Sequence, residues 1–179
     1  KLVLAPRAEA VQQAKEQAVK SAPETVVAQA EEKILPREDI LDEGRRVPID
    51  SPEIKGSLSL KGGRIDDIVF KNFYVDLEKT GQVALMSPSG ADQAHFTESG
   101  WLSQDSSIKL PDAESVWSAK TGTVSLTTET PVTLLWSNGN GLTFEKTYAI
   151  DQHFLITLTQ KVTNTSGKYV SLYPYASLT

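Results

Sequence analysis

Metal and acid–base sites usually recruit histidine, and this chain of 179 residues has only two. His95 and His153 are its only histidines, and neither has a second ligand at the short spacing that metal sites use. The absence of cysteine removes thiolate ligands, disulfides and thiol nucleophiles together. We therefore expect no metal site and no bound cofactor, with both histidines in surface loops or turns.

Asp66 and Asp67 are adjacent carboxylates that could be imagined as a catalytic pair. Consecutive residues of a β-strand point to opposite faces of the sheet, so two neighbours would not meet the same substrate. We expect both carboxylates on a solvated turn face. The serines lack a Gly-x-Ser-x-Gly elbow and a base spaced to activate one of them. The chain is therefore predicted to have no catalytic residues and not to be an enzyme.

Glu98 and Trp101 are the residues best suited to binding a partner. Most large aromatic side chains are expected in the core, but an indole can also line a groove. Trp101 stands within the segment Ser99 to Ser103 between polar stretches, which predicts an exposed loop. We predict that Glu98 and Trp101 belong to a partner-binding surface.

The chain changes character near residue 45. All eleven glycines and all aromatic residues follow residue 43, whereas the preceding segment is rich in Ala, Glu, Gln and Lys. Apolar residues at helical spacing predict short helices over 8–20 and 24–35. Their apolar stripes are mostly alanine, which buries little area. Residues 1–46 are therefore predicted to be a spacer, helical or disordered, that precedes a domain over 47–179.

From residue 52 onward apolar residues alternate with polar ones, which is the pattern of half-buried strands. Gly62 and Gly63 predict a tight turn between two strands, and Asp66 and Asp67 predict an irregular or bulged start to the second of them. The predicted strands cover 54–61, 65–72, 82–87, 122–128, 132–137, 142–150, 153–164 and 169–178. The predicted fold class is all-β, an antiparallel sandwich.

Charge and hydropathy argue against two further classes of protein. The formal net charge is −5, so the chain lacks the basic surplus that nucleic-acid binding uses. No run of about 18 apolar residues occurs, and no export-signal pattern opens the chain. We expect no nucleic-acid partner and no membrane span within these residues, and any anchor would belong to segments outside them.

The order of several short motifs adds a resemblance to a known family. The segment GSLSLKGGRIDDIVF at 56–70 resembles the first hairpin of the extracytoplasmic domain of YidC-type membrane protein insertases from Gram-negative bacteria. The similarity continues in order through LMSPSG at 85–90, ESGW at 98–101, PVTLLW at 131–136, NGNGL at 138–142 and LYPY at 172–175. Each motif alone is a generic β pattern, but the ordered set spans about residues 47–179.

The resemblance implies an antiparallel β-supersandwich like that of galactose mutarotases, in the periplasm beside the bacterial inner membrane. The family domain continues past the position of Thr179, so the sandwich is expected to be partial, and the membrane-embedded insertase would follow it. The implied function is non-catalytic: an interaction and folding domain of an insertase and chaperone that helps membrane proteins insert and fold, with or without the Sec translocon. The implied partners are that translocon, its accessory subunits and nascent membrane proteins.

Two other functions stay open on the sequence alone. A carbohydrate-binding or mutarotase-like sandwich would need a histidine and a carboxylate that converge in its cleft for proton transfer. The two histidines of this chain lie outside the mutarotase motifs. A secreted structural module would require an export signal and no membrane helices. The sequence does not decide which face of the domain meets a partner.

Overall fold

The computed structural model describes residues 34–42 and 44–179, and every structural statement below concerns these residues. The predicted helix over 8–20 lies outside them, as does the helix over 24–35 except for Ile34 and Leu35. Leu35 forms a parallel bridge with Ala91 instead of a helical turn. That residues 1–46 form a spacer stays a prediction, although its last part contacts the domain.

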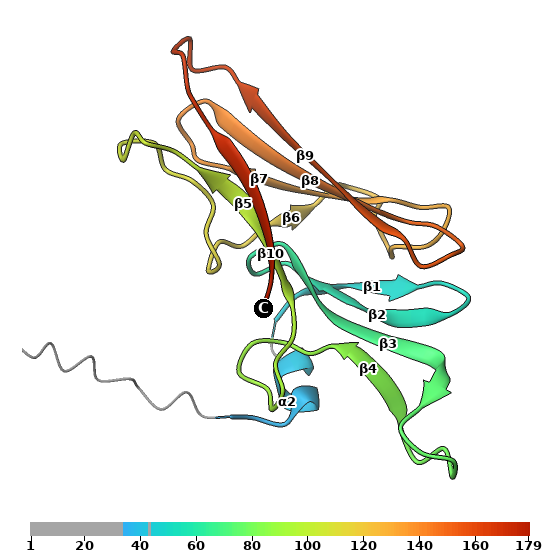
Figure 1. The fold of residues 1–179 in the computed structure, drawn as a ribbon. Coiled ribbons are helices and arrows are strands. Elements are labelled where there is room, and N and C mark those ends of the chain that lie inside the picture. The colour runs from blue at the N-terminus through green and yellow to red at the C-terminus, as the bar shows by residue number, and fades with distance from the viewer. Residues whose placement is uncertain (1–33, 43) are drawn as a thin grey trace, which may run out of the picture. The chain divides into compact units, whose positions relative to one another are not determined.

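Strands and loops make up almost all of the described chain (Figure 1). Its one helix, α2, is short and spans Arg37–Asp42. The strands are β1 (Arg46–Asp50), β2 (Ile54–Ser59), β3 (Arg64–Tyr74), β4 (Gln82–Met86), β5 (Thr97–Leu102), β6 (Ser118–Ala119), β7 (Val132–Ser137), β8 (Leu142–Ile150), β9 (Ile156–Asn164) and β10 (Tyr173–Leu178).

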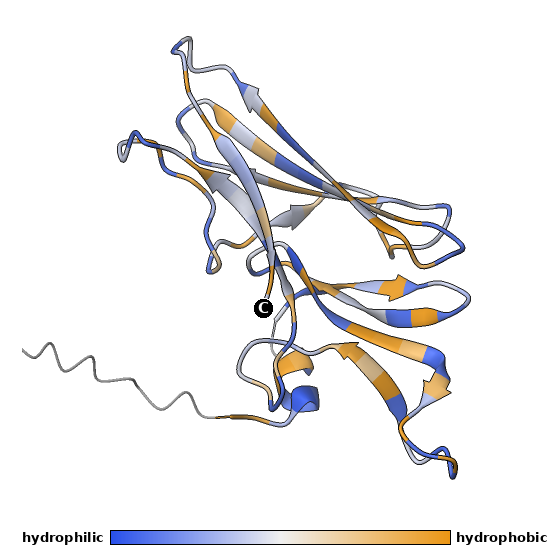
Figure 2. Cartoon of the chain, viewed as in Figure 1, coloured by the Kyte–Doolittle hydropathy of each residue, from blue (hydrophilic) through white to orange (hydrophobic). Residues whose placement is uncertain are grey.

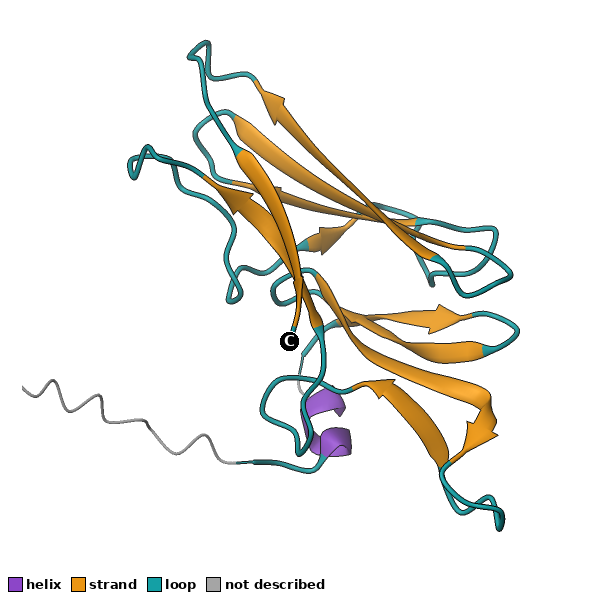
Figure 3. Cartoon of the chain, viewed as in Figure 1, coloured by secondary structure: helices purple, strands orange, loops and turns teal. Residues whose placement is uncertain are grey.

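The strands form three sheets in which every neighbouring pair is antiparallel. The first sheet has the order β1-β2-β3-β4, the second pairs β10 with β5, and the third has the order β6-β7-β8-β9. Figure 3 shows that α2 is the only helical segment drawn beside these sheets. The predicted all-β antiparallel sandwich is therefore confirmed.

Alternation of polar and apolar residues accounts for β7, β8 and β9 of the third sheet. The bounds of β7 and β8 are those predicted from the sequence, and every second residue of β8 from Leu142 to Ile150 is buried. Figure 2 shows the alternating colours along β8 and β9. A strand with one buried face needs this period of two, because successive side chains point to opposite sides.

The other elements depart from the sequence pattern at several places. The structure has three strands that alternation does not predict, β1, β5 and β6. The predicted strand over 122–128 does not form, and its Leu126 makes only an isolated parallel bridge with Ile49. Leu126 is nevertheless fully buried, so this loop fills the core with one side chain and does not extend a sheet.

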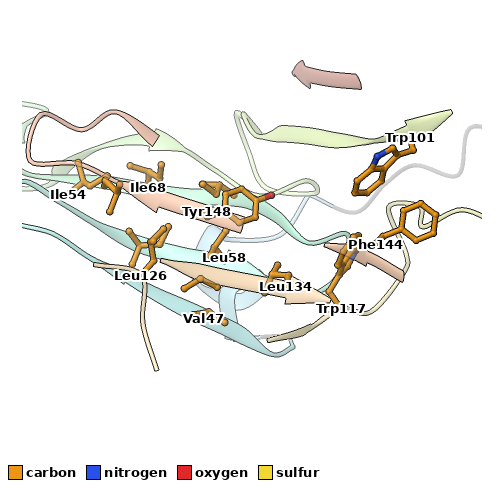
Figure 4. Close-up of a cluster of buried hydrophobic side chains, with 14 of the residues drawn as sticks. Val47, Ile54, Leu58, Ile68, Trp101, Trp117, Leu126, Leu134, Phe144 and Tyr148 are labelled. Carbon is orange, nitrogen blue, oxygen red and sulfur yellow. The ribbon is translucent and has the colours of Figure 1, made fainter. Parts of the chain in front are cut away.

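One hydrophobic core joins side chains from all three sheets. Its buried members are Val47, Ile49, Ile54, Leu58, Ile65, Ile68, Trp101, Trp117, Leu126, Val132, Leu134, Leu142, Phe144, Tyr148 and Ile150. Figure 4 shows Trp101, Trp117 and Phe144 gathered at one end of this cluster. The aromatic end of the core lies under β5, the strand that carries Glu98.

Candidate functional site

A small pocket opens beside Glu98, one of the two residues predicted to bind a partner. Arg64, Trp117, Lys146 and Tyr175 contribute to its wall. Arg64 donates a hydrogen bond from Nη1 to Oε1 of Glu98 at 3.2 Å, and the Glu98 side chain remains 36% exposed. The pocket volume is about 30 Å³, room for about two water molecules.

Lys146 is the least expected member of this pocket, because its residue is only 1% exposed. Its Nζ donates to the carbonyl oxygens of Gly62 at 3.0 Å, Gly63 at 3.1 Å and Ser99 at 2.8 Å. An ammonium group has three N–H donors, so these carbonyls satisfy all of them. Nζ also lies 4.8 Å from the ring centroid of Trp117, where a cation is attracted to the indole face.

Burial lowers the pKa of Lys146 to about 8, and repulsion from Arg64 adds to the effect, while Glu98 acts in the opposite sense. The amine is thus still mostly protonated at neutral pH. A nucleophilic lysine needs a free amine in reach of a substrate. Because its three protons are donated to carbonyls and the pocket holds only about two waters, the arrangement is a structural clamp.

The clamp closes on the turn between β2 and β3. Tyr148, two residues after Lys146 on β8, donates its hydroxyl to the carbonyl of Gly63 at 2.7 Å, and burial raises its pKa. Gly63 has a φ of +57°, and a Cβ there would lie 2.9 Å from the Trp117 ring. The close approach of indole and backbone therefore requires glycine. Two polar side chains from the third sheet hold the tip of the first.

Trp101 does not have the exposure predicted for it. Its residue is 5% exposed, and its ring stacks on Trp117 at a centroid distance of 6.4 Å and meets Phe144 edge-on at 4.9 Å. The prediction is wrong because the segment around Trp101 forms β5 and directs the indole into the core. Glu98, three residues earlier, is the member of the predicted pair that reaches solvent. Partner binding by either residue stays a prediction.

The expected solvated position of Asp66 and Asp67 is also wrong, since they are only 2% and 7% exposed. The predicted bulge explains the difference: Ser57 pairs with Asp67 while Leu58 pairs with Ile65, which leaves Asp66 unpaired on β3. An extra residue in one strand brings two neighbours toward the same side. The alternation argument that separated the two carboxylates does not hold at a bulge.

Arginines neutralise this buried pair of carboxylates. Asp66 accepts from Arg46, and Asp67 accepts from Arg37 of α2 and, at 2.6 Å, from the hydroxyl of Ser57. The Nε of Arg46 donates to the same Ser57 hydroxyl at 2.7 Å, which links the two carboxylates in one network. The network fixes the first strand and α2 to the middle of the sheet.

The histidines lie where the sequence predicts, in exposed positions outside the pocket. His95 pairs with Ser87 through the backbone, and the backbone N–H of His153 donates to Asp151 in a turn. His95 and Asp92 share the wall of a separate pocket beside Leu35 and Arg37, but neither histidine lies in the pocket beside Glu98. Within residues 34–42 and 44–179, no group of three or more histidine or acidic side chains is placed to hold a metal ion.

Sequence reasoning missed Lys146, although a signal for it was present. Lys146 lies two residues from Phe144 and two from Tyr148, on the face of the predicted strand that points to the core. A charge at this position must therefore be buried. No comparable signal marked Arg37 and Arg46 as partners of the adjacent carboxylates. Their pairing depends on the bulge and on α2, which are tertiary features.

Comparison with known proteins agrees with this architecture. The profile of the YidC periplasmic domain matches residues 46–179. Proteins named membrane protein insertase YidC are similar over much of the chain. They are 38% identical over 80% of this chain in Pelagibacter ubique, 41% over 80% in Bradyrhizobium diazoefficiens and 44% over 73% in Nitrobacter hamburgensis.

The matched region covers only 26%, 23% and 22% of these three relatives, so the chain spans about a quarter of their length. In the described part of this chain, no helix has the length and apolar character needed to cross a bilayer. The profile match extends over more than half of the chain and begins at the first residue of β1. The chain thus belongs to the YidC periplasmic domain family.

Proposed function

We propose that the chain is a non-catalytic interaction domain of an inner-membrane protein insertase. Its relatives carry the name membrane protein insertase, which supports this assignment. The observation that carries the non-catalytic part is the pocket beside Glu98. Its buried amine is held by three carbonyls, and the space beside it fits about two waters, so the amine of this pocket does not face room for a substrate.

The proposed partners are nascent membrane proteins and the Sec translocon with its accessory subunits. Glu98 is the residue we propose at the contact, because it is charged, partly exposed and held by Arg64 above a rigid aromatic core. Trp101, which is 5% exposed, supports β5 from the core side, beneath Glu98. A fixed carboxylate on a rigid strand can select for basic or hydrogen-bond-donating segments.

Photo-crosslinking in membranes tests this proposal. A photoreactive amino acid at position 98, in an insertase that contains this chain, is expected to crosslink to a translocon subunit or to a nascent membrane protein. The same amino acid at position 129, an exposed loop glutamate, is the control. The proposal fails if crosslinks from position 98 are no stronger than those from position 129.

A charge reversal gives a second readout. Glu98→Lys is expected to weaken partner recovery on co-purification, whereas Glu129→Lys changes the net charge equally without altering this surface. Equal recovery of partners with both variants would remove Glu98 from the contact.

A sugar-binding function finds no support at this site, because pockets that bury small molecules usually measure about 300 to 1,000 Å³.

A further inference from the structure

A second pocket, at the other side of Arg64, has a different chemistry. Its volume is about 270 Å³, and it lies at one end of β1, β2 and β3, with Ile40 of α2 and the loop after β4 on its other sides. The polar side chains of its wall that matter below are Arg45, Arg46, Ser59, Lys61, Arg64 and Asp66. Four are basic and one is acidic, on a chain whose net charge is −5.

The strand register produces this concentration of positive charge. Arg46 pairs with Ser59 across β1 and β2, and Ser59 pairs with Arg64 across β2 and β3. Residues directly opposite one another project from the same face, so the two arginines flank one serine in a single row. The row is fixed by backbone pairing and does not depend on flexible side chains meeting by chance.

Arg46 and Arg64 each have guanidinium N–H groups that donate to no acceptor among the described residues. Within the described residues, Arg64 donates one hydrogen bond, from Nη1 to Glu98, and Arg46 uses Nε and Nη2 but not Nη1. A guanidinium has five N–H donors arranged in a rigid fork. Asp66 lies between the two groups, 3.6 Å from Nε of Arg64 and in contact with Arg46, which holds both guanidiniums in place.

Two exposed cations complete the rim. Among the described residues, Arg45 makes no side-chain hydrogen bond or ion pair, and Lys61 pairs with Glu114 through side chains that are 56% and 76% exposed. Exposed pairs of this kind contribute little and exchange partners easily. Both cations are therefore available to an anion that enters the pocket.

We propose that this pocket binds a phosphate group, carried by a phospholipid headgroup or by a soluble phosphate ester. Phosphate matches the site because its tetrahedral oxygens accept from more than one guanidinium at once, and arginine forks favour such bidentate contacts. The pocket also has the room that a phosphate with part of its ester group needs. The proposal stands apart from partner binding at Glu98, which lines the other pocket.

The first test is a titration of the 179-residue chain with inorganic phosphate, followed by the amide resonances of the protein. Saturable shifts at Arg46, Ser59 and Gly90 are expected. The variant Arg45→Glu with Lys61→Glu should weaken binding by roughly tenfold or more, because each reversal removes an attraction and adds a repulsion. Both residues are exposed and outside the buried carboxylate network, so the fold is expected to persist.

The matched control is Lys55→Glu with Lys120→Glu, which changes the net charge equally at exposed residues outside the pocket. Absence of saturable shifts with phosphate, or equal weakening in the control pair, would overturn the proposal. Shifts confined to these amides and lost only in the pocket variant support it.

Vesicle flotation then separates the two sources of phosphate. Binding to vesicles of equal parts phosphatidylglycerol and phosphatidylcholine, but not to phosphatidylcholine alone, assigns the pocket to an anionic headgroup when the pocket variant abolishes it. Binding to inorganic phosphate without vesicle binding assigns the pocket to a soluble phosphate ester. Either result should weaken at high salt, as expected for a partly exposed ionic site.

Discussion

The domain buries charge in two regions that solve the same problem differently. In the first sheet, the carboxylates of Asp66 and Asp67 are surrounded by arginine side chains from separate elements. In the third sheet, the ammonium of Lys146 has only backbone carbonyls as hydrogen-bond acceptors. A buried charge is costly unless it is paired or fully hydrogen-bonded, and each region meets one of these two conditions.

The carboxylate network and the lysine clamp depend on different parts of the protein. The carboxylate network has several cationic partners, so the loss of a peripheral one leaves others in place. The lysine depends on the backbone geometry of one turn and one strand, which side-chain substitutions elsewhere cannot supply. We therefore expect substitutions in the carboxylate network to differ from one another in their cost to stability. Loss of Lys146, by contrast, should remove all the contacts of the lysine clamp at once.

The largest effect is expected from Asp66→Asn. It leaves Arg46 and Arg64 without the charge that both contact, and breaking a buried ion pair from one side costs about 3 to 5 kcal/mol. Urea unfolding measures the change in the free energy of unfolding. The control Asp50→Asn removes a carboxylate that is 68% exposed and pairs with Lys71, and should cost less than about 1 kcal/mol. Similar losses in both variants would contradict the comparison.

Lys146→Met should destabilise the domain by about 2 kcal/mol at neutral pH. The carbonyls of Gly62 and Ser99 would lose their contact with Nζ, while removal of a buried charge offsets part of this loss. Lys161→Met, at a side chain that is 63% exposed, is the matched control and should change stability little. A stabilised Lys146→Met protein would show that desolvation outweighs the carbonyl contacts.

The pH dependence of stability tests the same lysine with its side chain left in place. Because its pKa falls from 10.5 to about 8 on folding, the unfolded chain binds more protons between these values, and stability should rise with pH there. The rise between pH 8 and 10 should be about 2 kcal/mol. Tyr148, whose pKa is raised by burial, opposes it only at higher pH.

Thermal unfolding across this range, compared between the native protein and Lys146→Met, isolates the contribution of the lysine. The variant should lack the rise, since the other titrating groups are common to both proteins. Parallel pH profiles would mean that the amine titrates alike in the folded and unfolded states.

A smaller effect is expected from Arg37→Ala, about 1 kcal/mol, because Asp67 keeps its hydrogen bond from Ser57 and Arg37 is 27% exposed at its side chain. The structural effect of Arg37→Ala should be confined to the segment around α2. The backbone N–H of Leu35, which donates to Gly90 at 3.0 Å, should exchange with solvent faster. Glu38→Ala, at an exposed position of the same helix, should leave this exchange unchanged.

Glu98→Gln should have the smallest effect on stability, less than about 1 kcal/mol, since its side chain is 36% exposed and its pair with Arg64 is partly screened. Thermal unfolding checks this, with Glu145→Gln, which pairs with Lys161 at 3.0 Å, as a comparable case. A large loss for Glu98→Gln would place this residue among the structural charges. Its role would then no longer be separable from the fold.

Sequence patterns predicted β7 and β8 of the third sheet well and β5 of the second sheet poorly. In β7 and β8, apolar residues alternate without interruption, so the period of two identifies both strands to the residue. In β5, polar residues precede Gly100, and the buried face is not visible in the pattern. What decides β5 is its pairing with β10, a partner more than seventy residues away along the chain. Local periodicity does not contain that information.

The candidate site was predictable only in part. The surface position of Glu98 agrees with its sequence surroundings, whereas Trp101 is buried because its strand directs it inward. Lys146 could have been identified because it lies on the same strand face as Phe144 and Tyr148. The acceptors that make its burial possible could not, since they are carbonyls of a turn and of another strand.

The bulge at Asp66 also makes the number of residues in β3 matter as much as their types. Ile65 and Ile68 are both buried although three positions separate them, a spacing that uninterrupted alternation forbids. One extra residue between them restores the inward direction of Ile68. Loss of a residue elsewhere in β3 would turn the rest of the strand inside out. Loss of Asp66 would leave Ile65 and Ile68 two positions apart and both facing inward, but it would remove the carboxylate that Arg46 and Arg64 contact.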